Sequence, residues 1–150
     1  MVEVALFEAI LLGQTGERSV QKSSVQEEEM ENQGYLKLIM WQKSMELVEF
    51  SYALIRMLPV SESECLGSQM RRAVVSIPSN IAKGYTRYGA GEYTRFLKIA
   101  LGSCAELETQ LQICVRTCLL TEDAVCKAAD LLVEIKRMLN ASIRTLRRKK

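Results

Sequence analysis

The sequence predicts an all-α protein, an up-down bundle of four helices. Four segments carry apolar residues at alternating steps of three and four, the spacing of one helix face. No segment alternates apolar and polar residues with the period of two that marks a half-buried strand. The chain of 150 residues has only 2 Pro and 8 Gly, which permits long helices. Short connections between the four segments make consecutive helices antiparallel.

The first predicted helix ends at Pro59. A capping box, Ser61 with Glu64, is expected to begin the second helix, and Gly84 is expected to cap its C-terminal end. Pro78 falls inside the second helix, where we expect a kink because the apolar spacing continues past it. The stripe of the first helix is Leu38, Trp41, Met45, Val48, Tyr52 and Ile55, and that of the second is Leu66, Met70, Ala73, Ile77 and Ile81.

The third helix is expected to run from Tyr93 to Cys118. The fourth begins after Thr121, a predicted N-cap, with Glu122 and Asp123 in the first turn, where their charges suit the helix dipole. The third stripe is Tyr93, Leu97, Ala100, Cys104, Leu107, Leu111, Cys114 and Cys118, and the fourth is Val125, Ala128, Leu132, Ile135, Leu139 and Leu146.

Polar residues form a further stripe on each of the two central helices. Gly102 belongs to one of them, at a cost of about 1 kcal/mol in helix propensity relative to Ala, which is tolerated where another backbone comes close. We therefore predict that the two polar stripes meet, with Glu106 as the ionic partner of Arg71 or Arg72. The stripes are Gln69, Arg72, Ser76, Ser79, Asn80 and Lys83 on the second helix and Arg95, Gly102, Ser103, Glu106 and Gln110 on the third.

The net charge of +2 is the sum of two regions of opposite sign. Residues 1–34 hold seven acidic and two basic side chains, a net charge of −5, whereas residues 35–150 hold 18 basic and 11 acidic ones, a net charge of +7. Because residues 13–34 are polar without periodicity, we interpret residues 1–34 as a mostly disordered acidic extension of a bundle domain at 35–150. Met30 is an alternative start, which leaves open whether residues 1–29 belong to the natural product.

The composition argues against an enzyme. Histidine is absent, which removes the commonest general base and the commonest metal ligand. No cofactor or metal is expected, because Cys104, Cys114 and Cys118 lie on the apolar stripe and are interpreted as core residues. The sequence has no apolar run long enough to span a membrane, its first twelve residues lack the basic start of a signal peptide, and its cysteines are expected to stay reduced. These features favour a cytoplasmic protein.

Four stretches carry a resemblance to a known family: WQKSMELV (41–48), SQMRRAVVSIPSNIAKGYTR (68–87), EYTRFLKIALGSCAELETQL (92–111) and IKRMLNASIRTL (135–146). They resemble the bacterial four-helix-bundle proteins encoded in intervening sequences of large-subunit ribosomal RNA. The accessory variability proteins of diversity-generating retroelements are more distantly similar. The resemblance covers residues 35–146, and its two most specific runs, Ser-Ile-Pro-x-Asn-Ile-Ala-x-Gly and Gly-Ser-x-x-Glu-Leu-Glu, occur together.

The resemblance implies a four-helix bundle that assembles as a ring, a pentamer, with a basic surface that associates with nucleic acid. RNA is expected before DNA, since the relatives reside in ribosomal RNA intervening sequences or act beside a reverse transcriptase, which would be a protein partner. The family usually has Glu where this chain has Lys83, so a carboxylate role is lost there and positive charge is gained. The resemblance therefore implies the fold more sharply than the activity.

Two sets of basic residues are candidates for salt-dependent contacts with a phosphate backbone. The alternative for the first set is a salt-bridge network between helices or subunits, and for the second a solvated helix end that compensates the dipole. Tyr85, Tyr88 and Tyr93 either stack on unpaired bases or pack a loop or an oligomer interface. The sets are Arg71, Arg72, Lys83, Arg87, Arg95 and Lys98, and, at the C-terminus, Arg144, Arg147, Arg148, Lys149 and Lys150.

The sequence thus predicts a non-enzymatic, oligomeric, nucleic-acid-associated bundle. The alternative function is an oligomeric scaffold or protein-interaction module that does not bind nucleic acid directly, with its basic residues serving structure. The two differ in one observable property, a salt-sensitive affinity for RNA or DNA.

Overall fold

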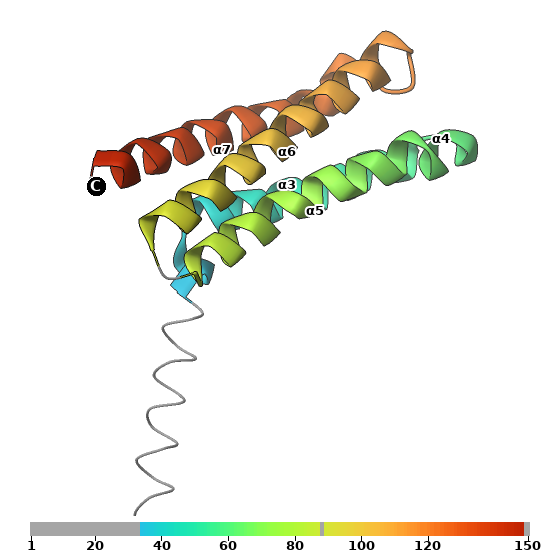
Figure 1. Ribbon diagram of the computed structural model, residues 1–150. Coiled ribbons are helices and arrows are strands. Elements are labelled where there is room, and N and C mark those ends of the chain that lie inside the picture. Colours follow the sequence, from blue (N-terminus) through green and yellow to red (C-terminus); the bar gives the residue numbers. More distant parts are fainter. Residues whose placement is uncertain (1–33, 88, 149–150) are drawn as a thin grey trace, which may run out of the picture. The chain divides into compact units, whose positions relative to one another are not determined.

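The computed structural model describes residues 34–87 and 89–148, which form a bundle of four long helices (Figure 1). The all-α prediction is confirmed, since this part of the chain contains no strand. The elements are the 3-10 helix η1 (Gly34–Lys37), α3 (Ile39–Met57), the short α4 (Val60–Glu64), α5 (Leu66–Tyr85), α6 (Ala90–Arg116) and α7 (Glu122–Arg148). The extension predicted at residues 1–34 falls, except for Gly34, outside the described residues, as do Tyr88, Lys149 and Lys150.

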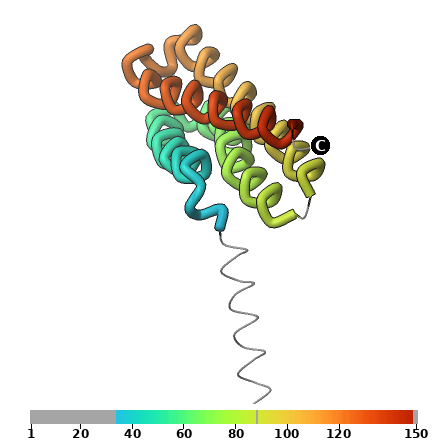
Figure 2. The backbone as a smooth tube through the Cα atoms, turned by 90° about the vertical axis from the view of Figure 1, so that its left-hand side faces the viewer, coloured from blue at the N-terminus to red at the C-terminus, as the bar shows by residue number. Residues whose placement is uncertain are grey.

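Each long helix packs against two others, in the order α3, α5, α6, α7 and back to α3. The chain reverses direction at each connection, so neighbouring helices are antiparallel (Figure 2). The bundle therefore has two distinct ends. The α5–α6 end combines the start of α3, the end of α5, the start of α6 and the end of α7. The α6–α7 end combines α4 with the remaining helix ends.

The core follows the predicted stripes on α5, α6 and α7, apart from the exposed Cys118 and three partly buried residues, Leu66, Tyr93 and Leu146. Its fully buried side chains come from all four helices, so one hydrophobic core holds the bundle together. Pro78 is itself buried, and α5 continues through it without a break. The largest fully buried side chains include Leu47, Ile55, Met70, Ile77, Ile81, Leu97, Leu107, Leu132, Ile135 and Leu139.

The buried face of α3 differs from the predicted one by one residue. Leu47 and Leu54 lie in the core together with two serines, Ser44 and Ser51, which are also fully buried. Ser44 Oγ donates a hydrogen bond to the carbonyl oxygen of Met40, 2.6 Å away, so its burial leaves no polar hydrogen unpaired. The predicted stripe, apart from the buried Ile55, is only partly buried, and α3 therefore has more apolar surface than the core uses.

Of the two predicted N-terminal caps, one is wrong and one is confirmed. Ser61 and Glu64 do not form a capping box for α5, because they belong to α4, and α5 begins only at Leu66. At α7, the predicted N-cap is present: Thr121 Oγ1 accepts a hydrogen bond from the backbone N–H of Ala124, 3.2 Å away.

The prediction that Cys118 lies in the core is wrong, because α6 ends two residues before it and its side chain is exposed. The backbone N–H of Cys118 donates to Val115 O at 3.0 Å, and that of Leu119 donates to Cys114 O at 2.9 Å. With Cys118 at φ 58°, these bonds form a Schellman motif that turns the chain out of the helix. The core prediction is confirmed for Cys104 and Cys114, which are buried.

Neither Gly84 nor Gly102 has the role predicted for it. Gly84 is inside α5 and buried, so it does not cap the helix. A Cβ atom there would lie 2.8 Å from Phe96 Cβ and 2.8 Å from Tyr93 Cδ2, which means that α5 and α6 approach closely at this point. Gly102, where the close approach was predicted, is exposed, and a Cβ atom there would have no neighbour within 4 Å.

Replacing Gly84 and Gly102 separately by Ala should therefore change stability in opposite directions. Overpacking costs about 1–3 kcal/mol and the gain in helix propensity is about 1 kcal/mol, so Gly84→Ala is expected to destabilise the fold by about 1 kcal/mol. Gly102→Ala gains the propensity alone and should stabilise it by about 1 kcal/mol. Urea unfolding at a fixed protein concentration, followed by circular dichroism, measures both, and equal effects would contradict the close approach at Gly84.

Thiol reactivity should separate the five cysteines into two groups. Burial raises the pKa of the Cys104 thiol to about 12, so almost none of it is the reactive thiolate near pH 8. Cys65, Cys118 and Cys126 are exposed, and we expect only these three to be alkylated in the folded protein, with all five reacting in urea. Mass spectrometry of the alkylated peptides identifies the sites. Rapid labelling of Cys104 in the folded protein would show that the α6 core face is placed wrongly.

Candidate nucleic-acid interface

A polar seam lies between α5 and α6. Ser103 Oγ donates to Ser76 Oγ, 2.8 Å away, and Asn80 Nδ2 donates to Ser76 O at 2.7 Å and to Ser76 Oγ at 2.9 Å. Asn80 and Ser103 are buried. The Ser103–Ser76 bond joins α6 to α5, and because these polar groups bond to one another, they are not available to a ligand.

The outer part of the two polar stripes does not form the predicted ion pair. Arg71 donates to the carbonyl oxygen of Ser63 at 3.0 Å and to Ser63 Oγ at 3.2 Å, and so joins α5 to α4. Glu106 takes part in none of the salt bridges found among the described residues, and its side chain is exposed, as are those of Gln69 and Arg72. The predicted pairing of Glu106 with Arg71 or Arg72 is therefore wrong.

The topology gathers most of the predicted basic residues at the α5–α6 end. All of them are exposed there, and Glu92 is the only acidic residue in the segments 83–98 and 140–148. Arg71 and Arg72, by contrast, lie near the start of α5, towards the opposite end. The basic residues at the α5–α6 end are Lys83, Arg87, Arg95, Lys98, Arg144, Arg147 and Arg148.

The salt bridges between long helices use a different set of lysines. Lys43 Nζ lies 3.6 Å from Glu134 Oε2 and Lys127 Nζ lies 3.4 Å from Glu46 Oε1, which joins α3 to α7. Lys136 Nζ lies 2.7 Å from Glu108 Oε1, which joins α7 to α6. The hydrogen bond with Glu46 raises the pKa of Lys43, as does the negative charge of Glu134.

Among the predicted basic residues, only Arg95 forms a salt bridge within the described part of the chain. Its partner is Glu92, one turn away on the same helix, at 3.4 Å. Within one chain, the basic residues of the α5–α6 end therefore take no part in salt bridges between helices, and their charges remain available at the surface.

Aromatic side chains pack the α5–α6 turn and position two of its arginines. The rings of Tyr85 and Tyr93 meet edge to face with their centroids 6.2 Å apart. The guanidinium carbons of Arg87 and Arg95 lie 5.6 and 5.8 Å from the centroid of the Phe96 ring, a distance at which cation–π attraction acts. Burial raises the pKa of Tyr93, with a smaller contribution from Tyr85. Tyr93 thus packs the turn, while Tyr85 retains an exposed edge.

A concave site opens between the start of α6 and the end of α7. It has a volume of about 320 Å³ and brings together three predicted basic residues from two helices. Gly91 and Thr94, also in its lining, were not predicted as site residues, although two glycines at the start of α6, Gly89 and Gly91, were a signal that backbone is accessible there. The lining residues are Gly91, Thr94, Arg95, Lys98, Leu146 and Arg147.

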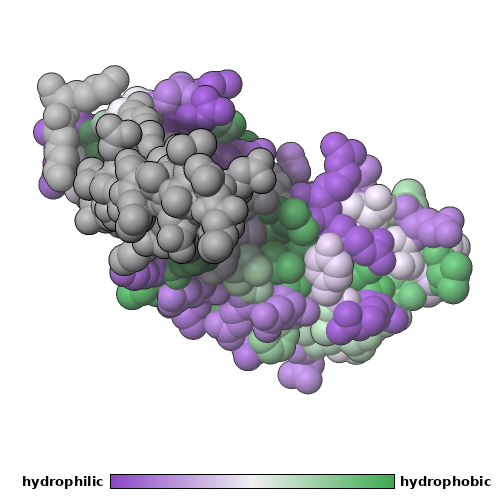
Figure 3. All heavy atoms as spheres, turned by 90° about the horizontal axis from the view of Figure 1, so that it is seen from below, coloured by the Kyte–Doolittle hydropathy of each residue, from purple (hydrophilic) through white to green (hydrophobic). Residues whose placement is uncertain are grey.

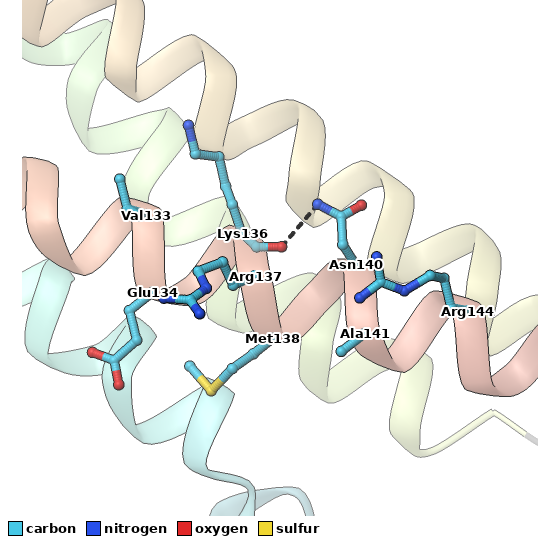
Figure 4. Close-up of a pocket in the computed structure, with 8 residues that line it drawn as sticks. All are labelled: Val133, Glu134, Lys136, Arg137, Met138, Asn140, Ala141 and Arg144. Atoms are coloured by element: carbon cyan, nitrogen blue, oxygen red, sulfur yellow. Dashed lines mark hydrogen bonds between the residues drawn. The ribbon is translucent and has the colours of Figure 1, made fainter.

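A second depression follows α7 towards the middle of the bundle (Figure 4). Arg137 and Arg144 are seven residues apart, which places them on the same helix face. Asn140 Nδ2 donates to the carbonyl oxygen of Lys136 at 2.9 Å. Arg137 was not among the predicted residues, and it extends the basic surface from the α5–α6 end along α7. The lining residues are Val133, Glu134, Lys136, Arg137, Met138, Asn140, Ala141 and Arg144.

An apolar groove separates α3 from α5. It has a volume of about 280 Å³ and includes Trp41, Met45 and Val48, three residues of the predicted α3 stripe that the core does not bury. Val75, in its lining, is 40% exposed. Figure 3 shows one face of the molecule, on which hydrophobic residues lie between hydrophilic ones. The groove is lined by Tyr35, Trp41, Met45, Val48, Val75, Pro78, Ser79 and Ala82.

The described part of the chain offers neither a membrane span nor a metal cluster. None of the helices there has the length and apolar character needed to cross a bilayer. Residues 34–87 and 89–148 also contain no cluster of three or more His, Cys, Asp or Glu side chains arranged to hold a metal ion.

Comparisons with known proteins agree with this fold. The family model described as 23S rRNA-intervening sequence protein matches residues 36–141. The chain is similar to the crystal structure of a protein of unknown function from the S23 ribosomal protein family of Bacteroides thetaiotaomicron. The TM-score is 0.65 at 25% sequence identity, over 70% of this chain and 98% of that chain. A search of curated proteins finds no match. The chain belongs to the 23S rRNA-intervening sequence protein family.

Proposed function

We propose that this protein is a non-enzymatic, oligomeric bundle that associates with nucleic acid, RNA before DNA, through its α5–α6 end. One observation carries the proposal: seven exposed basic residues gather at this end, with Glu92 as the only acidic residue in segments 83–98 and 140–148. A surface with this charge attracts a polyanion and releases its counterions on contact. The choice of RNA is supported by the family, whose name refers to intervening sequences of 23S rRNA.

Binding of this kind reads the phosphate backbone and the shape of the nucleic acid. The basic residues come from helix ends and a turn, and none belongs to a helix placed to enter a groove, so we expect contacts with phosphates rather than with base edges. Assembly into a ring, for which we propose five subunits, would repeat the basic end in every subunit and raise the avidity for a long strand. The non-enzymatic part of the proposal rests on the absence of histidine.

The first test is the binding of the full-length chain to a structured RNA and to duplex DNA, measured by fluorescence anisotropy across a salt series. We expect a Kd in the micromolar range at low salt. We also expect log K to fall linearly with log salt, with a slope of roughly −0.7 to −0.9 for each phosphate neutralised. The absence of binding even at low salt would exclude the proposed function.

A pair of triple variants tests where the nucleic acid binds. Neutralising Lys83, Arg144 and Arg148 with Gln should lower RNA affinity by about tenfold or more and reduce the salt slope by roughly 1 for each phosphate that is no longer neutralised. The matched control replaces Arg56, Arg72 and Arg116 with Gln. These are three exposed arginines towards the α6–α7 end, and the change in net charge is the same.

The control should bind almost as well as the unmodified protein. A control that loses as much affinity as the test variant would place the binding surface over the whole bundle, and would support a nucleic-acid role for Arg72. Circular dichroism confirms that both variants are folded.

A second candidate function is a scaffold or protein-interaction module, which the apolar groove between α3 and α5 favours. Its lining includes apolar side chains that are not buried in the core, and exposed apolar side chains that lie together are typical of surfaces that bind other proteins. Tight self-assembly, measured by light scattering, together with no salt-sensitive affinity for RNA or DNA, would favour this function over the first.

A further inference from the structure

We propose that the concave site between the start of α6 and the end of α7 binds the terminal phosphate monoester of a nucleic-acid strand. This inference rests on the proposed function and adds to it the part of the ligand that the site recognises. The site, with a volume of about 320 Å³, has room for a terminal phosphate group.

The side chains of the site supply positive charge from two helices. Arg95 and Lys98 come from α6 and Arg147 comes from α7, and all three are exposed. Glu92 is the acidic group beside them, and it lies 3.4 Å from Arg95. Lys98 and Arg147 form no salt bridge among the described residues, so their donors are free to contact an anion.

The first turn of α6 also has unpaired backbone donors, and Gly91 of that turn lines the site. The N-cap residue is Gly89, so no side chain caps the helix. The first backbone N–H that bonds back to the turn is that of Tyr93, which donates to Gly89 O at 3.1 Å. The N–H groups of Ala90, Gly91 and Glu92 precede it and have no acceptor within the helix. Gly91 lines the site and has no side chain, so an anion can approach this backbone closely.

The hydroxyl of Thr94 is not a free hydrogen-bond donor for a ligand. Its hydroxyl donates to the carbonyl oxygen of Ala90 at 2.7 Å, so its proton is used within the helix. The side-chain donors that remain in the site are two cationic groups on α6 and one on α7, and Gly91 adds a part of the lining that carries no side chain. This set is suited to a strongly charged ligand with several acceptor oxygens.

A terminal phosphate fits this set better than an internal one. A phosphate monoester carries a charge of about −1.5 to −2 near pH 7 and three acceptor oxygens. An internal phosphodiester carries one negative charge, and its strand must both enter and leave the site. The site is concave and has a helix end on each side. A strand that ends in the site does not have to leave it again, so a terminal phosphate is easier to accommodate than an internal one.

The test compares RNA oligonucleotides of one sequence with a 5′-phosphate, a 3′-phosphate or only hydroxyl ends, each labelled internally. Fluorescence anisotropy with the full-length chain measures the three affinities. We expect one phosphorylated form to bind about tenfold more tightly than the form with hydroxyl ends, the effect of one added charge-assisted interaction. The result also identifies which end of the strand the site takes.

Two double variants assign the preference to the site. Lys98→Gln with Arg147→Gln should abolish the preference for the phosphorylated end. The matched control, Lys83→Gln with Arg148→Gln, removes the same charge from residues outside the site. It should weaken all RNAs alike and retain the ratio. All four residues are exposed, and circular dichroism checks that both variants fold.

The outcomes separate this inference from the proposed function. Equal affinity for all three RNAs would overturn the inference and leave the proposed function standing. A Lys98/Arg147 variant that weakens every RNA equally would also overturn it, because the site would then contact internal phosphates. No RNA binding at low salt would exclude the proposed function itself, and the inference with it.

Discussion

The close approach of α5 and α6 at Gly84 is the constraint on which the rest of the α5–α6 end depends. Because Gly84 has no side chain, Tyr93 and Phe96 pack directly against the α5 backbone. Phe96 in turn lies beside the guanidinium groups of Arg87 and Arg95. The hydrogen bond between the partly buried Ser76 and the buried Ser103 joins the same pair of helices further along. Packing between two helices thus sets the positions of the surface charges.

The sequence was sufficient for the fold because periodicity carries that information. On α5 and α6 the residues of the predicted apolar stripes between Met70 and Leu111, with the exception of the partly buried Tyr93, are buried in the core. On α3 the apolar periodicity predicted a face that is displaced by one residue from the buried face, because the buried face includes Ser44 and Ser51. Ser44 is buried at little cost because its hydroxyl bonds to its own helix, whereas Ser51 Oγ is buried without a hydrogen-bond partner, and a hydrophobic pattern detects neither.

The members of the candidate site were predicted by residue type, but their grouping was not. Lys98 and Arg147 are far apart in the sequence, and only the return of α7 beside α6 brings them to one concave site. Arg71 looked equivalent to them, but α4 supplies Ser63 as its partner, and that short helix has no clear sequence signal. Gly91 was missed because its contribution is its backbone.

The uneven distribution of charge also affects how this protein meets a partner in solution. The α6–α7 end holds Glu62 and Glu64 beside arginines, whereas the α5–α6 end is almost purely basic, so the bundle has an electric dipole along its long axis. In the field of a polyanion such a dipole experiences a torque, which rotates the basic end forward before any contact forms. With the proposed nucleic-acid partner, encounters would then be oriented in advance, and the association rate would fall as salt shortens the range of that field.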